Sequence, residues 1–279
     1  MTIPENVVLL DSLGDIHTDN IYPILVCGSH CGDNGTFARK LKNCAVQAVF
    51  LNNAGIGKNN AGISGLGFYD AANIMACAVS HNSAEIGVSA DTWESGIITH
   101  VNRHAEAADI QKGDSVQEAV AKISKLTTQR ESAFENVIPA SATENQPAAL
   151  KKYTQTQING VSITVADSIT CLGADNAGDI LVCGSHGGVS AGHYAEKLQL
   201  KAAFFNDAGI GKNNAGIKSL DSLSDLGILA CTVDCMSAEI FNAEDALENG
   251  IISVCNQLAK DKNIREKMTV KEAPMLIYP

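Results

Sequence analysis

The sequence predicts an α/β protein built from two homologous, tandemly duplicated halves, each a three-layer α/β unit with a mainly parallel sheet, related by a pseudo-two-fold axis. Three observations support this prediction: whole segments recur in the same order, short apolar runs alternate with helical stretches, and glycine-rich turns follow several of the runs. Alternation of this kind is typical of parallel sheets covered by helices.

The repeated segments are identical in the two halves. They are ILVCGSH at 24–30 and 180–186, AGIGKNNAGI at 54–63 and 208–217, SAEI at 83–86 and 237–240, and GII at 96–98 and 250–252. A period of more than roughly 100 residues is too long for a solenoid and matches a domain-sized unit. The chain therefore divides into a first repeat (1–128), a polar linker (129–157) and a second repeat (158–279).

Each half contains the same succession of predicted elements. Short apolar runs indicate strands that are buried on both faces. These runs lie at 7–10, 24–27, 48–51, 74–79 and 97–101, and again at 161–165, 180–183, 202–205, 228–233 and 251–254. Helices are predicted at 36–41, 116–123 and 192–198. Another helix is predicted after each glycine- and asparagine-rich loop, and a short acidic helix after each fourth run.

Composition and charge restrict the class of partner. The chain of 279 residues is 45% apolar and 18% charged, which is ample material for a core, and its net charge is −11. This charge argues against a nucleic-acid or anionic membrane partner. No segment approaches the roughly 20 apolar residues that a membrane helix needs, and the start has no secretory signal features. We expect the partner to be a small-molecule substrate or ligand. The sequence is compatible with a homo-oligomer but does not determine the oligomeric state.

The nine cysteines indicate a reducing compartment. Their number is odd, most of them lie within apolar runs, and no CxxC occurs. This usage is typical of reduced core cysteines, so the predicted location is cytoplasmic.

Serine and histidine follow the second run in each half, where parallel sheets commonly hold ligands. His186 and His30 are predicted acid/base groups, Ser185 is a candidate nucleophile or donor, and Ser29 and Gly188 are predicted to contact the substrate. Adjacent strand residues point to opposite faces, which disfavours Ser185 and His186 as a nucleophile–base pair. The alternative is a tight turn whose histidine bonds a neighbouring carbonyl.

The glycine-rich loop after the third run is predicted to hold a negative charge. Lys58 and Asn59 in the first half match Lys212 and Asn213 in the second. Backbone N–H groups and a lysine in such loops bind anions, including a developing oxyanion. The alternative is a structural loop with capping asparagines and solvated lysines. Neither a Walker A nor a GxGxxG motif is present, so no cofactor is predicted.

Differences between the halves suggest further roles. Asp207 replaces Asn53, so Asp207 is predicted to orient His186 and Asn53 to contact substrate. Cys31 and Cys235 are candidate thiol nucleophiles, against the alternative of small buried residues.

Repeated acidic residues and scattered histidines complete the candidates. Glu85 and Glu239 are candidate substrate-binding or acid/base groups, with lysine pairing and helix capping as alternatives. His100 and His104 have helical spacing but no counterparts in the second half, so no metal is predicted.

A strand ending in Ser185-His186-Gly187 resembles caspase-like peptidases, whose next strand ends in a nucleophilic cysteine. Here the next strand ends in Asn206-Asp207-Ala208-Gly209. The central residue of that pattern is missing, and no family is assigned.

The leading functional hypothesis is a hydrolase of C–N bonds that acts on a small polar or anionic amide-like metabolite in the cleft between the halves. His186 would be the acid/base, Asp207 its orienter, Ser185 or a water the nucleophile, and Lys212 with Asn213 the anchor. The alternatives are a non-catalytic binding protein for an anionic metabolite and a cofactor-independent lyase or isomerase with a lysine or histidine base.

Overall fold

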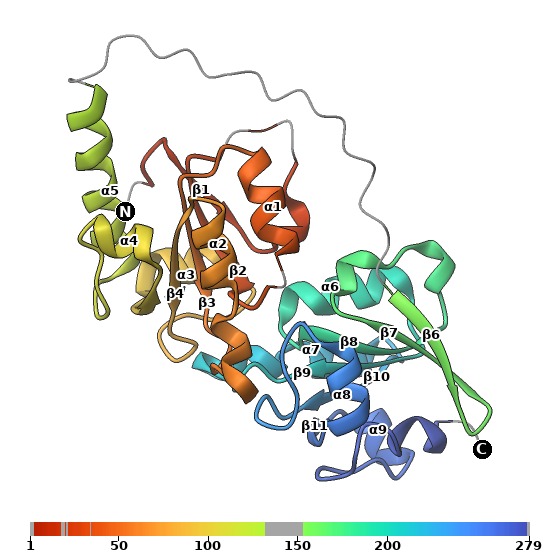
Figure 1. The fold of residues 1–279 in the computed structure, drawn as a ribbon. Helices are drawn as coiled ribbons and strands as arrows, with labels where there is room; N and C mark the ends of the chain where they lie inside the picture. The colour runs from red at the N-terminus through yellow and green to blue at the C-terminus, as the bar shows by residue number, and fades with distance from the viewer. Residues whose placement is uncertain (1–2, 18–19, 21, 34, 132–152, 278–279) are drawn as a thin grey trace.

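The computed structural model describes residues 3–17, 20, 22–33, 35–131 and 153–277. Their strands form two sheets that lie in separate halves of the molecule (Figure 1), one with the order β1-β2-β3-β4-β5 and one with the order β11-β10-β9-β8-β7-β6. Helices are interleaved with the strands in both halves, which confirms the predicted α/β class.

The helices and strands follow the same succession in each half, except that β6 is added at the start of the second half and α5 at the end of the first. In the first half they are β1 Val7–Leu10, β2 Ile24–His30, α1 Thr36–Asn43, β3 Ala48–Asn52, α2 Gly65–Ala71, β4 Met75–Val79, α3 Ser89–Ser95, β5 Ile98–Val101, α4 Arg103–Ala107 and α5 Val116–Glu131. In the second half they are β6 Tyr153–Ile158, β7 Val161–Ala166, β8 Ile180–His186, α6 Val189–Leu198, β9 Ala202–Asn206, α7 Ser219–Asp225, β10 Leu229–Val233, α8 Ala243–Asn249, β11 Ile252–Cys255 and α9 Gln257–Asp261. Short 3-10 helices include η1 Leu13–Asp15, η2 Lys58–Ile63, η3 Ile169–Cys171 and η5 Lys212–Ile217.

Each sheet is buried on both faces, as its apolar strands require. In the first half, Val26 and Phe50 pack with residues of α3, α4 and α5, whereas Leu25 and Val49 pack with residues of α1 and α2. Neighbouring residues of a strand point to opposite faces, so one apolar run supplies two cores. The second half repeats the arrangement with α8 and α9 on one face and α6 and α7 on the other.

The strands follow one another in chain order, and this order has a consequence for ligand sites. β1 to β4 are parallel, as are β7 to β10, and the antiparallel strands β5, β11 and β6 lie at sheet edges. The crossover helices α1 and α2 share one face, as right-handed connections between successive neighbours require. Such a sheet has no point where the strand order reverses, so it forms no crevice of its own.

The predicted strands lie where the sequence places them, with two differences. β2 and β8 continue to His30 and His186, so the Ser-His pairs end the strands and do not follow them. β6 occupies 153–158 at the end of the predicted linker, and the linker residues 132–152 lie outside the described part of the chain. The predicted domain boundaries stay a prediction. Among the described helices, none combines the length and apolar character needed to cross a membrane.

The identical AGIGKNNAGI loops meet where the carboxyl ends of the two sheets face each other. A Cβ atom on Gly55 would lie 2.8 Å from the Cα of Gly209, and both glycines have positive φ angles, +73° and +72°. The backbone N–H of Lys58 donates to the carbonyl of Cys235, and that of Lys212 donates to the carbonyl of His81, each at 2.8 Å. The halves therefore contact each other through the same loop in both directions.

We expect Gly55→Ala to destabilise the protein more than Gly227→Ala. Gly227 has a similar φ of +79° but open space around its Cβ position, so its substitution carries only the backbone strain, about 1 kcal/mol. Gly55→Ala adds a clash with Gly209, raising the loss in the free energy of unfolding to about 2–4 kcal/mol. Urea denaturation measures both values, and equal losses would contradict the close approach.

Candidate functional site

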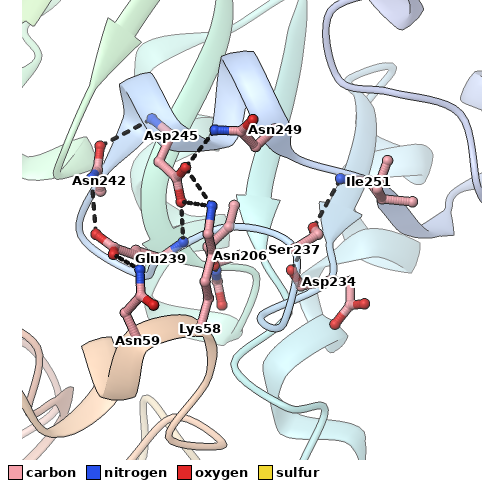
Figure 2. Close-up of polar contacts among 11 residues, drawn as sticks. Lys58, Asn59, Asn206, Asp234, Ser237, Glu239, Asn242, Asp245, Asn249 and Ile251 are labelled. Atoms are coloured by element: carbon pink, nitrogen blue, oxygen red, sulfur yellow. Dashed lines mark hydrogen bonds and ion pairs between the residues drawn. The ribbon is translucent and has the colours of Figure 1, made fainter.

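The two lysines of the repeated loops pair with carboxylates of the opposite half. Lys58 Nζ lies 2.6 Å from Asp245 Oδ1, and Lys212 Nζ lies 2.7 Å from Asp91 Oδ1. Figure 2 shows Lys58 leaving its loop and pointing at Asp245 on α8. Because each lysine charge is already balanced, the predicted role of these loops as anion anchors has no support in their contacts.

The neighbouring asparagines and glutamates also join the two halves. Asn59 Nδ2 donates to Glu239 Oε1 and Asn213 Nδ2 to Glu85 Oε1, each at 2.7 Å (Figure 2 for the first pair). Lys218 Nζ adds an ion pair to Glu85 at 2.8 Å, so for this glutamate the lysine-partner interpretation matches the structure. The substrate-binding role predicted for these four residues stays a prediction.

The serines and histidines of the two ILVCGSH segments gather in one cavity between the halves. Its volume is about 30 Å³, and each half lines it with the same kinds of residue, chiefly Ser12, Ser29, His30 and Phe37 from the first half and Ser168, Ser185, His186 and Tyr194 from the second. We call it the histidine cavity. The structure thus brings together the Ser-His pairs that the sequence singled out.

An irregularity at the end of β8 lets adjacent residues face the same cavity. β8 pairs with β9 through Val182 and again at His186, with a register shift between them. Within that stretch Gly184 touches the chain at Phe241 and Asn242, where a Cβ atom would lie 2.7 Å from the Asn242 nitrogen. The alternation expected of a regular strand is lost, so Ser185 and His186 both line the cavity.

His186 is held as a neutral hydrogen-bond donor. The backbone N–H of Gly188 donates to its Nδ1 at 3.1 Å, so the neutral ring carries its proton on Nε2. Burial, together with the nearby His30, lowers the pKa of His186 to about 3. A Cβ on Gly188 would lie 2.7 Å from that Nδ1, which explains why glycine occupies this position.

His30 is the freer of the two imidazoles. Burial lowers its pKa to about 4, and its Nδ1 has no hydrogen-bond partner among the described residues. The two rings stand edge to face with centroids 6.3 Å apart. Both histidines are therefore neutral near pH 7, and they face each other from equivalent positions.

The two serines add hydroxyl groups to the cavity lining. Ser29 Oγ accepts the N–H of Leu13 at 2.9 Å, and Ser185 Oγ accepts the N–H of Ile169 at 3.1 Å. Each hydroxyl also bonds the thiol of the cysteine two residues earlier, Cys27 or Cys183. The cavity thus combines these hydroxyls and the His186 Nε2–H with His30, whose Nδ1 makes no hydrogen bond among the described residues.

Asp207 and Asn53 lie outside the histidine cavity and share a structural task. Asp207 Oδ1 accepts the N–H groups of Gly209 and Cys235 at 2.9 and 3.0 Å, and Asn53 Oδ1 accepts that of His81 at 3.0 Å. Burial raises the pKa of Asp207. Since the bond to His186 Nδ1 comes from Gly188, the predicted role of Asp207 as orienter has no support in the described contacts. A cluster of metal-ligand residue types lies here: the ligand atoms of Asp207, Asp234 and Cys235 are within 4.8 Å of one another. These three ligands are fewer than the four of a closed zinc site.

The candidate thiol nucleophiles are buried. Cys31 has no exposed surface, and burial raises the pKa of its thiol far above the usual value. Burial likewise raises the pKa of Cys235 to about 12. Both thiols are protonated near neutral pH, so the geometry lends no support to a nucleophilic role, whereas it agrees with the alternative of small buried residues.

Aromatic residues at the cavity are functional candidates that sequence reasoning missed. Phe37 and Tyr194 line the cavity. Phe241, whose ring centroid lies 5.6 Å from that of His30, lines an open groove of about 620 Å³. One signal was visible in the repeats, because Phe241 stands where the first half has Gly87. We call this hollow of about 620 Å³ the groove.

Comparison of the chain with protein-family models, with curated proteins and with solved structures finds no match in any of the three. A role is therefore inferred from the geometry alone.

We expect the two buried histidines to make the protein less stable as the pH falls below about 6.5. The unfolded chain binds protons near its ordinary histidine pKa, whereas the folded protein resists protonation until about pH 4 or lower. Stability is full above that window and falls within it by up to about 1.4 kcal/mol per pH unit for each histidine. Urea unfolding between pH 7.5 and 5 measures this slope.

A matched pair of variants isolates the contribution of the cavity. His30→Gln with His186→Gln should reduce the slope to what the half-buried His81 and His100 contribute, whereas His193→Gln, on the exposed face of α6, should leave the slope unchanged. The same slope in the double variant as in the unmodified protein would contradict the assignment.

Proposed function

We propose that this chain is a cofactor-independent hydrolase that cleaves the carbonyl C–N bond of a small polar metabolite in the histidine cavity. The observation that supports the proposal is the pairing of two neutral, buried imidazoles from equivalent positions, one a fixed Nε2–H donor and the other free to accept a proton. Buried acid–base groups that face one another are characteristic of catalytic sites.

The proposed reaction uses the contacts described above. His30 takes a proton from a water molecule as the oxygen of that water bonds to the carbonyl carbon, and a cavity of about 30 Å³ has room to hold the water. The negative charge that develops on the carbonyl oxygen receives a hydrogen bond from His186 Nε2–H. The C–N bond then breaks as protonated His30 gives its proton to the leaving nitrogen.

This proposal changes the roles inferred from the sequence. His186 becomes a donor to the oxyanion in place of a base. The backbone N–H of Gly188 already donates to the unprotonated Nδ1 of His186, so that nitrogen is not available to accept another proton. Lys212 and Asn213 leave the site, because their side chains bind Asp91 and Glu85 across the halves. The preference for an anionic substrate loses its support with them.

We include in the proposal that the chain arose by duplication and that its halves are related by a pseudo-two-fold axis. The identical segments of the sequence support it, as do the reciprocal bonds of Lys58 and Lys212 to the opposite half. A cytoplasmic location is also part of the proposal, supported by buried cysteines with free thiols within apolar strands, such as Cys27, Cys77 and Cys183.

A second candidate is an isomerase that moves a proton at a carbon next to a carbonyl. It is favoured by the two histidines facing each other across one cavity, since one base can remove a proton while the other returns it. Incorporation of solvent deuterium into unhydrolysed substrate would distinguish this reaction from amine release.

We expect His30→Gln and His186→Gln each to lower turnover by about 10²- to 10⁴-fold, the usual contribution of an acid–base or oxyanion-stabilising group. The exposed His193→Gln is the control and should retain full activity. Amine release from a panel of small amides measures the effect. Full turnover in both cavity variants would refute the proposal.

We expect activity to persist at pH 5 and to fall only as the pH approaches about 4. His30 with a lowered pKa remains an unprotonated base well below the ordinary histidine value of about 6.5. Initial rates measured in short assays, with folding checked by circular dichroism at each pH, give the profile. An acid limb centred near pH 6.5 would contradict the assignment of His30.

A further inference from the structure

Phe241 adopts a backbone conformation that bulky residues rarely occupy. Its φ is +65°, in the left-handed region, and the equivalent residue of the first half, Gly87, has φ +83°. A glycine enters this region at no steric cost, whereas a phenylalanine needs its surroundings to hold it there. The second half therefore has a large side chain at a point where the first half has none.

The Phe241 ring is packed against the histidine cavity. Its centroid lies 5.6 Å from that of His30 and 5.7 Å from that of Phe37, and both of these residues line the cavity. Phe241 itself lines the groove, together with Ile240 and Phe68. The ring thus has the cavity behind it and the groove in front of it.

The sizes of the two hollows make this position important. The groove has a volume of about 620 Å³, which is in the range of small-molecule sites, whereas the cavity has about 30 Å³. The groove can hold a whole metabolite, whereas the cavity has room only for the reacting group of one. Phe241 connects the two, because it lines the groove while its ring lies against that of His30.

The equivalent position on the other side of the cavity has no aromatic ring. A Cβ atom on Gly87 would lie 3.1 Å from Ser190 Oγ and 3.3 Å from His186 Cε1, so no ring fits there. The two histidines therefore differ in their surroundings: His30 lies next to the groove, and His186 lies next to Ser190.

We propose that Phe241 closes the histidine cavity toward the groove and sets the size of the group that can reach His30, with the groove as the entrance for substrate. The statement about substrate size rests on the proposed function. The closure of the cavity does not, because it concerns only access to the His30 ring.

Chemical labelling of histidine tests the closure directly. Diethyl pyrocarbonate modifies neutral, accessible imidazoles, and peptide mass spectrometry at pH 7 gives the labelling rate of each histidine. We expect His30 to be protected in the unmodified protein, with the exposed His193 as the reactive reference. Phe241→Gly, which copies Gly87, should raise the rate at His30 by about tenfold or more, because labelling then needs no local opening.

Two further variants make the result decisive. Phe241→Asn is the second probe, since asparagine tolerates a positive φ and has a small side chain. Phe68→Ala removes another aromatic ring of the groove, one that is 44% exposed, and should leave His30 protected. Circular dichroism melting confirms that each variant is folded.

Each outcome supports or overturns the proposal. Faster labelling of His30 in folded Phe241 variants, but not in Phe68→Ala, supports it. Unchanged protection of His30 in a folded Phe241 variant overturns it, and so does unfolding of both variants, because the ring would then hold the halves together rather than close the cavity.

The substrate range is a separate measurement. Phe241→Gly should accept amides with larger groups next to the carbonyl, and an unchanged range alongside faster labelling would overturn the size-setting part. If no amide is cleaved by the unmodified protein, the proposed hydrolysis fails while the labelling result still decides the closure.

Discussion

The close approach of Gly55 and Gly209 is the constraint on which the arrangement of the two halves depends. Only a residue without a side chain lets the two loops cross at this separation with positive φ angles. The crossing directs the carboxyl ends of both sheets toward each other, so that β2 and β8 deliver their terminal histidines to one cavity. Ion pairs of the two loop lysines and hydrogen bonds of the neighbouring asparagine side chains join the halves around the crossing.

Much of the fold could be predicted from the sequence, because its strands are apolar on both faces and a repeated pattern reduces the chance of a wrong assignment. The strands β2 and β3 are examples: Val26 and Phe50 are buried in the core on one face of the sheet, and the residues before them, Leu25 and Val49, are buried in the core on the other face. β6 was missed because its side chains are mostly exposed and polar, which removes the periodic signal that indicates a strand.

The candidate site was predictable in part. The Ser-His segments could be found because they are repeated at strand ends, but the partners of Lys58 and Lys212 could not, for a physical reason. A lysine in a glycine-rich loop has the same local pattern whether it binds a ligand or a distant carboxylate, and its partners here are 187 and 121 residues away in the chain. The orientation of Ser185 also depends on a register shift that residue types alone do not reveal.

The sequential strand order of each sheet bears on how such a protein could have evolved. A sheet without a reversal in strand order offers only an edge to a ligand, so a single unit would bind little until a second copy covered that edge. In a symmetric ancestor every residue at the covered edge would be present twice and would have to suit both copies. If the halves arose by the duplication proposed above, joining the copies in one chain removes that restriction, and the glycine at position 87 and the phenylalanine at position 241 are a difference that such independence permits.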